Sequence, residues 1–523
     1  MTGEPLLLAI DNGTQSVRAL LFDLAGELVA GEKVPIEPYF AERPGRAEQH
    51  VDVYWGAVCK ACAGLMAKAG ADAGRIGGMA VTTQRATVVN LAADGRPLRP
   101  AIVWLDQRRC ERPPPLPRAI ELAARATGRG EILHELRVQA QCNWISENEP
   151  DVARETARFL LLSGYLNWRL TGECADSTAA QVGFLPFDYK RQTWAGARDI
   201  RWRALAVARE QLPELVPAGG RIGSVSADAA AATGLPAGLP VIAAGTDKAC
   251  ELLGSGCLEP SVAGISYGTT ATINTANSRY VEVTPPMPAY PAAIPAHWNT
   301  EVMIRRGYWM VEWFIREFGD HLPDAGLTDP DVAGAAAYKQ LERLLAETPP
   351  GDDGLLLQPY WSPGTPFPGS EARGAAIGFG DMHGRAHFYR AIVEGIGHAL
   401  HQAGTLLAKR NRVPIERLRV AGGGAQSDAV MQITADIFGL PAERPHLTEA
   451  SGLGAAINVA VGMGLHEDYA TAVERMTRIG TRFEPNAEIH RLYERIHRQA
   501  YSKMYKRLRP VYRELREITG YPP

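Results

Sequence analysis

Two stretches far apart in the chain follow the same pattern. A β-rich apolar run enters a short polar turn that contains glycine, and a second β-rich run follows. The first stretch occupies residues 6–22 and turns at residues 11–14; the second occupies residues 261–274 and turns at residues 268–270. Apolar runs separated by a polar turn predict a β-hairpin. Because the hairpins lie in separate halves, we expect two similar domains that face one ligand across a cleft.

The turns are suited to phosphate oxygens, because tight turns expose N–H groups and these carry hydroxyls as well. Gly13 lets the backbone approach a ligand closely, and Thr14 adds a donor. Asp11 offers a carboxylate that can hold Mg²⁺ directly or through water. The alternative for the first stretch is an ordinary Asp-Asn-Gly turn, and the second copy favours the phosphate interpretation. Arg18 either adds charge near the phosphates or projects outward from its strand.

A third element lies at residues 419–445. A short strand ends in three glycines at 422–424, and an apolar-periodic helix follows from about Asp428. A strand, a glycine turn and a helix start are typical of a nucleotide-binding corner. The phosphate loop GxxxxGK[ST] does not occur in this sequence.

One carboxylate follows a buried strand near the middle of the chain. Residues 239–244 are apolar, Asp247 follows after Gly245 and Thr246, and residues 248–253 have a helical pattern. An aspartate at this place can cap the helix. It can equally act as a base, because ligands of α/β folds bind at the carboxyl ends of strands.

Five motifs in one order resemble the FGGY carbohydrate kinases: residues 11–16, 143–150, 268–270, 387–395 and 422–427. The resemblance covers nearly the whole chain. It implies an α/β fold of two ribonuclease H-like (actin-like ATPase) domains that flank a nucleotide and sugar cleft. We expect an N-terminal domain at 1–250, a C-terminal domain at 251–480, and a charged helical extension at 481–523.

The resemblance also implies roles for individual residues, with ATP and Mg²⁺ as cofactors and a small sugar or polyol as the partner. Asp247 matches the catalytic base, which takes the proton of the acceptor hydroxyl, and Asp11 matches the metal ligand. The expected acceptor contacts are Gln84, Arg85, Trp104, Asp106 and Asp247. The expected ATP contacts are Asn12, Gly13, Thr14, Gln15, Gly268, Thr269, Thr270, Gly423, Gly424, Ala425 and Ser427.

Departures from the family pattern bear on the acceptor. Glycerol kinases have Arg-Glu where this chain has Arg85-Ala86, and a tyrosine where Ser177 follows Asp176. Both departures argue against glycerol. Gln84 is kept from the xylulose kinase pattern, although its histidine is absent. The leading acceptor is a pentulose such as D-xylulose, with ribulose, another ketose, or a linear polyol such as erythritol as alternatives. A sugar or nucleotide sensor, and a motor-like ATPase, are hypotheses of other classes.

The length of 523 residues exceeds what one core supports, which agrees with two domains. The net charge is −3 and no basic stripe is present, so we expect no nucleic-acid partner. No apolar stretch approaches 18 residues and the start lacks a basic region, so we expect neither a membrane span nor a signal peptide. Seven cysteines, an odd number with no disulfide framework, favour the cytoplasm, and we interpret Cys59 and Cys62 as helix residues.

Local patterns predict further elements. Residues 87–91, with a turn at 94–95, predict a hairpin, and residues 156–170 predict a helix that stops at Gly172. Residues 281–298 are rich in proline and predict an inserted loop. Residues 307–318 predict a helix whose aromatic stripe we assign to the core. From residue 487 the pattern predicts a solvated surface helix with an aromatic packing stripe, and a homodimer contact there stays open.

Overall fold

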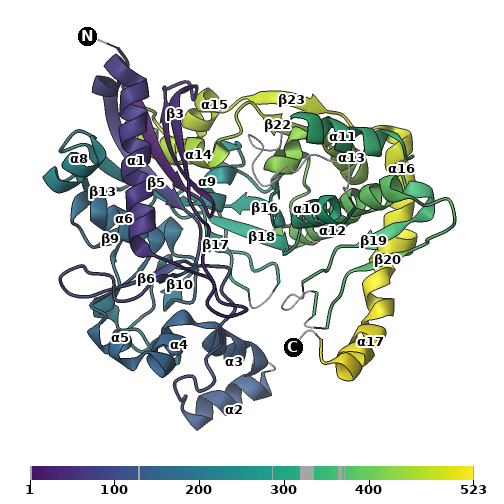
Figure 1. Cartoon of the computed structure of the whole chain (residues 1–523), viewed down its shortest axis with the longest axis horizontal. Helices are drawn as coiled ribbons and strands as arrows, with labels where there is room; N and C mark the ends of the chain where they lie inside the picture. Colours follow the sequence, from purple (N-terminus) through teal and green to yellow (C-terminus); the bar gives the residue numbers. More distant parts are fainter. Residues whose placement is uncertain are drawn as a thin grey trace.

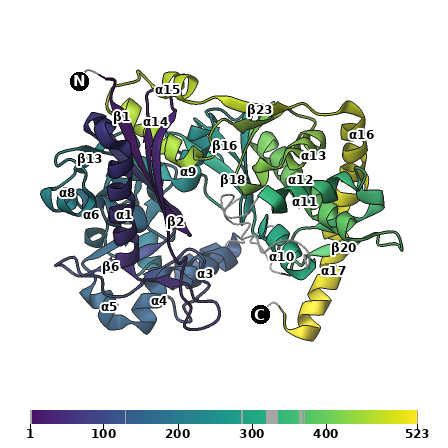
Figure 2. The ribbon, with the colours of Figure 1, turned by 45° about the horizontal axis from the view of Figure 1, so that its top comes forward.

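The computed structural model describes residues 3–127, 130–284, 287–318, 335–362, 368–369 and 371–521, without the side chains of 132 and 335–340. Two halves lie side by side (Figure 1), each built on a central sheet with helices on its faces. Turned by 45°, the molecule shows the N-terminal strands in one half and the last helix in the other (Figure 2).

The first sheet has six strands in the order β13-β14-β5-β1-β2-β3. Its centre is the predicted hairpin: β1 and β2 are antiparallel, β1 is parallel to β5, and β5 is parallel to β14. This arrangement puts the carboxyl ends of β1, β5 and β14 at one edge. The bounds are β1 (Leu6–Asn12), β2 (Ser16–Phe22), β3 (Leu28–Pro35), β5 (Ile76–Thr83), β13 (Arg221–Ser224) and β14 (Pro240–Thr246).

The second sheet repeats this topology. Its seven strands have the order β17-β18-β16-β15-β21-β22-β23, with β15 and β16 antiparallel and β15, β21 and β22 parallel. The two similar halves predicted from the repeated hairpin are confirmed. The bounds are β15 (Val262–Tyr267), β16 (Ala271–Asn277), β17 (Tyr290–Pro291), β18 (Trp298–Ile304), β21 (Arg417–Ala421), β22 (Ala442–Pro445) and β23 (Ile479–Phe483).

Strand β1 is buried along its whole length because both faces of its sheet are covered. Leu6, Leu8 and Ile10 face a core that includes helix α1 (Val51–Ala69), whereas Leu7 and Ala9 face a core that includes α9 (Asp247–Gly254) and α14 (Ala450–Gly462). This alternation follows from the two-residue period of a strand. A continuous apolar run therefore ends in the polar turn of the hairpin.

Helices α9 and α14 lie between the two halves of the molecule (Figure 2). Although α14 comes late in the sequence, it packs against β1, β5 and β14 of the first sheet. The two helices cross where Gly254 meets Ala450 and Gly454 meets Cys250, so closely that a Cβ atom on either glycine would overlap the facing backbone. Glycine is needed at both places for this approach. The domain boundary near residue 250 stays a prediction.

A four-stranded sheet, β4-β7-β6-β8, extends the first half. It corrects one expectation, since residues 158–161 form a strand before the helix begins at Leu162. It confirms another, because β6 forms the predicted hairpin with the chain that turns at residues 92–96 and returns antiparallel through Pro97 to β7. The apolar run in this segment, residues 159–161, was too short to separate strand from helix by its pattern. Its strands are β4 (Glu48–Gln49), β6 (Val88–Leu91), β7 (Ala101–Ile102) and β8 (Arg158–Leu161).

Helix α6 ends at Gly172, as predicted, and Gly172 has a left-handed backbone. The bounds of the remaining helices are α2 (Arg118–Ala126), α3 (Gly130–Gln139), α4 (Gln141–Asn148), α5 (Pro150–Glu155), α6 (Leu162–Thr171), α7 (Arg201–Ala204), α8 (Ala227–Thr233), α10 (Trp309–Phe318), α11 (Ala335–Ala346), α12 (Arg385–Asn411), α13 (Asp428–Phe438) and α15 (Tyr469–Met476). Short strand pairs complete the fold: β9 (Ala175–Ser177) with β12 (Glu214–Val216), β10 (Phe187–Asp188) with β11 (Thr193–Trp194), and β19 (Leu356–Gln358) with β20 (Ala375–Ile377).

The C-terminal segment is helical, as predicted, with α16 (Ala487–Ile496), a π-helical turn at His497–Tyr501 and α17 (Ser502–Thr519). Its aromatic stripe packs into the core of the second half. Tyr493 donates a hydrogen bond to Glu394 (2.7 Å), and Tyr501 donates one to the carbonyl of Gly395 (3.1 Å), both on α12. The segment is thus part of the second half rather than a detached helix.

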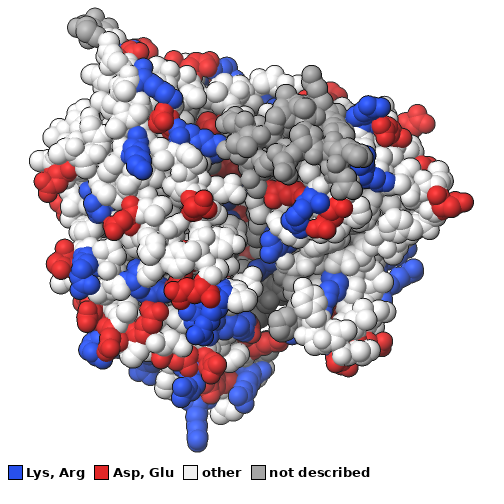
Figure 3. Space-filling model, in the orientation of Figure 1, with Lys and Arg blue, Asp and Glu red and all other residues white. Residues whose placement is uncertain are grey.

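Three further observations bear on the expectations about charge, membrane spans and disulfides. Acidic and basic side chains are interspersed over the face in Figure 3. Within the described ranges, no helix is long and apolar enough to cross a membrane. All seven cysteines carry free thiols.

We predict that Tyr501→Ala destabilises the second half, because Tyr501 is 1% exposed and its ring and hydroxyl both contact the core. Loss of a buried aromatic ring costs about 3–5 kcal/mol of unfolding free energy. Ile518→Ala is the matched control on the same helix segment, since Ile518 is 79% exposed. Urea titrations of the two variants test this, and equal midpoints would contradict the packing described.

Candidate active site

Asp247 is the first residue of α9 and stands at the carboxyl end of β14, as predicted. Thr246 caps the helix in its place, accepting a hydrogen bond from Ala249 N (3.4 Å). The Asp247 carboxylate accepts one from Lys248 N (2.7 Å). Burial raises the pKa of Asp247 to about 6, opposed by the charges of Lys248 and Arg85 and reinforced by that of Asp11. A carboxylate with this pKa can exchange a proton near neutral pH.

Arg85 follows β5 and reaches across to the second half of the molecule. Its guanidinium donates to both oxygens of Glu301 on β18, at 3.1–3.2 Å, and lies over the ring of Tyr290, 5.5 Å from the ring centre. Burial opposes the positive charge, but Glu301 and Asp247 outweigh it and raise the pKa of Arg85 above its usual value. Arg85 is therefore a fixed cation beside Asp247.

Gln84, Thr14 and Trp104 form one chain of hydrogen bonds. Trp104 Nε1 donates to the Thr14 hydroxyl (3.0 Å), which donates to Gln84 Oε1 (2.9 Å). The backbone reinforces it, since Gln84 N donates to the carbonyl of Asn12 (3.0 Å). Thr14 was expected among the ATP contacts, and here its hydroxyl is occupied by two expected acceptor contacts. The first hairpin and the acceptor side of the site are thereby coupled.

Asp106 lies in a buried ionic network. Its carboxylate accepts hydrogen bonds from Arg108 N, Nε and Nη2 (2.7–2.9 Å) and from Ala47 N (2.6 Å). Arg108 continues to Glu48 (3.0 Å) and stacks on Trp144, with its guanidinium carbon 4.4 Å from the ring centre. With four hydrogen bonds already accepted, the Asp106 carboxylate has little capacity to bind a ligand as well. Its contacts instead indicate that it stabilises the surrounding chain.

Asp11 is buried at the end of β1 and forms an ion pair with Arg18 (3.3 Å), which also pairs with Glu449 at the start of α14 (3.6 Å). Burial raises the pKa of Asp11 to about 6, against the lowering effect of Arg18, and Glu449 and Glu251 raise it further. Arg18 thus lies beside Asp11 rather than pointing away from the site. The side-chain oxygen of Asn12 is buried and has no hydrogen-bond partner within the described chain.

The two glycine turns close in the same way. Gly13 N donates to the carbonyl of Ser16 (3.0 Å), and Gly268 N donates to that of Thr270 (3.2 Å). The N–H group of each glycine is therefore used within its own turn. The following threonines, Thr14 and Thr269, have backbone N–H groups for which the described chain supplies no hydrogen bond. Gln15 lies in the same turn, and its carbonyl accepts from Ile36 N (2.8 Å).

A pocket in the second half brings five of the expected ATP contacts together: Gly268, Thr269, Gly423, Gly424 and Ser427. Two glycines shape it. Gly422 has a φ of +88°, and a Cβ atom on Gly424 would overlap the ring of Tyr308. The Tyr308 ring consequently packs directly against Gly424 and lines the pocket. Thr270 and Ala425 lie outside this lining, and Ala425 is buried.

Ser427 begins α13 and caps it, accepting a hydrogen bond from Val430 N (3.1 Å). Its hydroxyl donates to Glu342 on α11, which also accepts from Ala429 N (3.4 Å). The helix start thus faces a carboxylate as well as the pocket.

Sequence reasoning missed several residues of these sites. Tyr308 and Glu312 line the pocket although we assigned the aromatic stripe of that helix to the core, and burial raises the pKa of Glu312 to about 7. Glu301 and Tyr290 contact Arg85, and Lys248 donates to Glu251 (2.9 Å) and Ser266 (2.7 Å). The sequence gives no indication that these tyrosines and glutamates belong to a site, because they stand in a helix and in strands of ordinary pattern. Lys248 could have been predicted as a site residue, because it directly follows Asp247.

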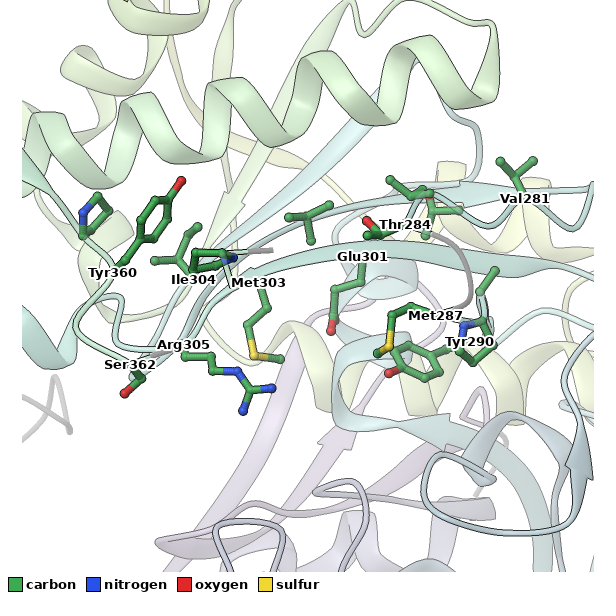
Figure 4. Close-up of a pocket in the computed structure, with 17 residues that line it drawn as sticks. Val281, Thr284, Met287, Tyr290, Glu301, Met303, Ile304, Arg305, Tyr360 and Ser362 are labelled. Carbon is green, nitrogen blue, oxygen red and sulfur yellow. The ribbon is translucent and has the colours of Figure 1, made fainter. Parts of the chain in front are cut away.

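A second cavity, of about 180 Å³, lies along β18 (Figure 4). It is lined by Tyr290, Glu301, Met303, Arg305 and the proline-rich residues before β17. Because Glu301 and Tyr290 also hold Arg85, this cavity adjoins the Asp247 site.

Comparison with known proteins agrees with this geometry. Residues 6–254 match the N-terminal domain, and residues 263–463 the C-terminal domain, of the FGGY family of carbohydrate kinases. The chain is 30% identical to an uncharacterized sugar kinase of Escherichia coli (strain K12), YgcE, over 98% of this chain and 96% of that protein. It is 27% identical to a xylulose kinase of Lactococcus lactis subsp. lactis (strain IL1403), over 98% and 99% of the two chains.

The crystal structure of xylulose kinase from Rhodospirillum rubrum is similar to this structure, with a TM-score of 0.81 and 27% identity, over 97% of this chain and 100% of that one. The expected fold of two actin-like ATPase domains is confirmed. This chain belongs to the FGGY family of carbohydrate kinases and is a phosphotransferase.

Proposed function

We propose that this protein transfers the γ-phosphoryl group of ATP to a hydroxyl of a ketopentose, with D-xylulose as the leading acceptor. The observation that carries the proposal is that Asp247, Arg85 and Asp11 lie close together at the strand ends of the first sheet. The first glycine turn follows Asp11, and Lys248 donates to Ser266 beside the second glycine turn. Phosphoryl transfer needs a positioned hydroxyl, a proton acceptor and donors for the phosphate oxygens. Each requirement has a candidate among these residues.

Asp247 would take the proton of the attacking hydroxyl. It is the carboxylate whose pKa of about 6 lies close to neutral pH at the end of β14. Arg85 would donate a hydrogen bond to an acceptor hydroxyl. The hydrogen bonds of Thr14 with Gln84 and Trp104 would fix these two acceptor contacts relative to the first glycine turn. Such positioning lowers the activation barrier of the transfer, because the entropy cost of orienting the reactants is met when they bind.

The nucleotide would lie in the pocket that Tyr308, Gly423 and Gly424 line. The N–H groups of Thr14 and Thr269 would donate to phosphate oxygens from the two halves. In this proposal the first hairpin holds the phosphates through its backbone, because the Thr14 hydroxyl is already engaged.

The residues around Asp11 fit Mg²⁺. Magnesium prefers oxygen ligands and is held in kinases by one or two carboxylates together with phosphates and water. Asp11 supplies a buried carboxylate, and the side-chain oxygen of Asn12 beside it has no partner in the described part of the chain. No cluster of three or more His, Cys, Asp or Glu suited to a metal occurs among the described residues. In this proposal Asp11 is the carboxylate that the protein contributes. When bound, Mg²⁺ would neutralise phosphate charge.

Residues near Arg85 favour a ketopentose over glycerol. Ala86 offers no carboxylate at the position after Arg85. Asp176 is buried and occupied by Ser163 (2.7 Å), Asn167 (3.1 Å) and Gln181 (2.7 Å), so it supports the fold rather than the acceptor. The retained Gln84 supports the same choice, as do two of the three named similar proteins, which are xylulose kinases.

The first prediction is that the purified protein with Mg-ATP releases ADP when a ketopentose is added. The panel contains ketopentoses, ketohexoses, aldoses, linear polyols and glycerol, and xylulose should give the highest kcat/KM. A preferred polyol or hexose would change the acceptor and keep the kinase. A flat panel with ATP still bound would contradict the proposal.

Asp247→Asn should keep ATP affinity and lose transfer by about 10²–10⁴-fold, the usual contribution of a general base. For the unchanged protein we expect kcat/KM to fall as the pH drops through about 6, because Asp247 must be deprotonated to accept a proton. Steady-state kinetics across pH 5–8 and ATP titration measure both effects. Retained acceptor-dependent transfer in the variant would refute the base assignment.

Gly424→Ala should weaken ATP binding, because the added methyl group pushes the Tyr308 ring into the nucleotide pocket. We expect KM for ATP to rise about tenfold with KM for the acceptor unchanged, which corresponds to one poorly placed contact. Gly56→Ala is the control, since a Cβ atom there meets open space. An unchanged ATP affinity would place the nucleotide elsewhere.

A further inference from the structure

Glu301 lies at the boundary between the two halves, and its main contact is Arg85. Three hydrogen bonds, from Nη1 and Nη2 of Arg85 to the two Glu301 oxygens, give the pair a two-pronged geometry that fixes the guanidinium plane. Both side chains are largely buried, at 17% and 7% exposure. The orientation of Arg85 at the acceptor side is thus set by a residue of the opposite half.

The floor beneath Arg85 is assembled in the same way. Tyr290, on which Arg85 stacks, makes an edge contact with Tyr189, with 5.9 Å between ring centres. Trp298 Nε1 donates to the carbonyl of Tyr189 (2.7 Å), and Gln192 donates to the carbonyl of His297 (2.7 Å). The β10–β11 hairpin of the first half therefore braces the β17–β18 hairpin of the second. The strand that carries Glu301 is therefore held in place by contacts with the first half.

The cavity face of β18 separates two charges. Glu301, Met303 and Arg305 extend from one side of the strand, and Ile304 from the other (Figure 4). Ile304 pairs with Ala271, directly after the glycine turn at 268–270, so Arg305 lies at the phosphate end. Glu301 is four residues earlier, about 13 Å along the strand. The cation at the acceptor end is Arg85, and Glu301 neutralises it.

An acceptor beside Arg85 therefore meets two carboxylates, Asp247 and Glu301, and one guanidinium. Lys248, the next cation, is itself paired with Glu251 (2.9 Å). The net charge of this group is negative, so a carboxylate on the acceptor would be repelled, whereas a hydroxyl can accept from Arg85 or donate to a carboxylate. Repulsion between these carboxylates and an acidic acceptor would therefore favour the neutral acceptor.

We propose that Glu301 is the positioning residue that fixes Arg85 and makes the acceptor site selective for neutral polyhydroxy acceptors over sugar acids. This inference rests on the proposed function and adds the charge class of the acceptor. Glu301 acts through Arg85 and makes no contact with the reacting atoms.

The test compares two acceptors of equal carbon number and configuration: the neutral acceptor that the unchanged protein uses best, and the corresponding aldonic acid; for xylulose the acid is xylonate. Glu301→Gln keeps the side-chain shape and removes its charge. We expect KM for the neutral acceptor to rise about 10- to 100-fold with a smaller change in kcat, as for a misplaced binding group. The ratio of kcat/KM for the acid to kcat/KM for the neutral acceptor should rise at least tenfold, which corresponds to about 1.4 kcal/mol.

Two further variants separate positioning from general damage. Glu301→Asp, which keeps the charge, should restore the preference for the neutral acceptor. Glu443→Gln removes another buried carboxylate of the second half that pairs with arginines, Arg419 (2.9 Å) and Arg482 (3.1 Å), and should leave the preference unchanged.

An unchanged acid-to-neutral ratio in Glu301→Gln, or an unchanged protein that prefers the acid, would overturn this inference and leave the kinase assignment standing. The second criterion needs no variant, so it applies even if Glu301→Gln fails to fold. A silent panel with the unchanged protein would instead overturn the proposed function.

Discussion

The architecture depends on the close crossing of α9 and α14. Gly254 and Gly454 let the two helix backbones touch, and each helix carries part of the site at its beginning. Asp247 starts α9, and Glu449, which pairs with Arg18 beside Asp11, precedes α14. A late segment of the chain therefore supports the first sheet and its carboxylates. Larger residues at the crossing would separate the helices and move both groups, because packed interiors transmit such displacements.

The chemistry follows from burying carboxylates at the strand ends between two similar halves. Burial raises the pKa of Asp11 and of Asp247 to about 6, and nearby cations keep these values from rising further. Shifted pKa values are common at functional sites, and buried structural carboxylates such as Asp176 share them, so the position of Asp11 and Asp247 at the strand ends carries the assignment. Arg85 links this centre to the second half through its ion pair with Glu301, and in the proposed function that pair also orients the group that binds the acceptor.

Features with a local signal could be predicted from the sequence. Both hairpins, the glycine turn before α13 and the aspartate that starts α9 were placed correctly, because alternation, glycine turns and strand-end polar residues are short-range patterns. Glu301 and Tyr308 could not be found, since their importance comes from contacts with Arg85 and Gly424, far away in the sequence. The helix expected at 156–170 was wrong at its start because residues 158–161 joined a sheet instead.

The most direct test of the account is ³¹P NMR of the protein with Mg-ATP and xylulose. The account predicts a new sugar phosphate ester signal that grows in step with ADP, with the transfer requiring Asp247. Inorganic phosphate and ADP without an ester, at a rate independent of the sugar, would contradict phosphoryl transfer to an acceptor hydroxyl.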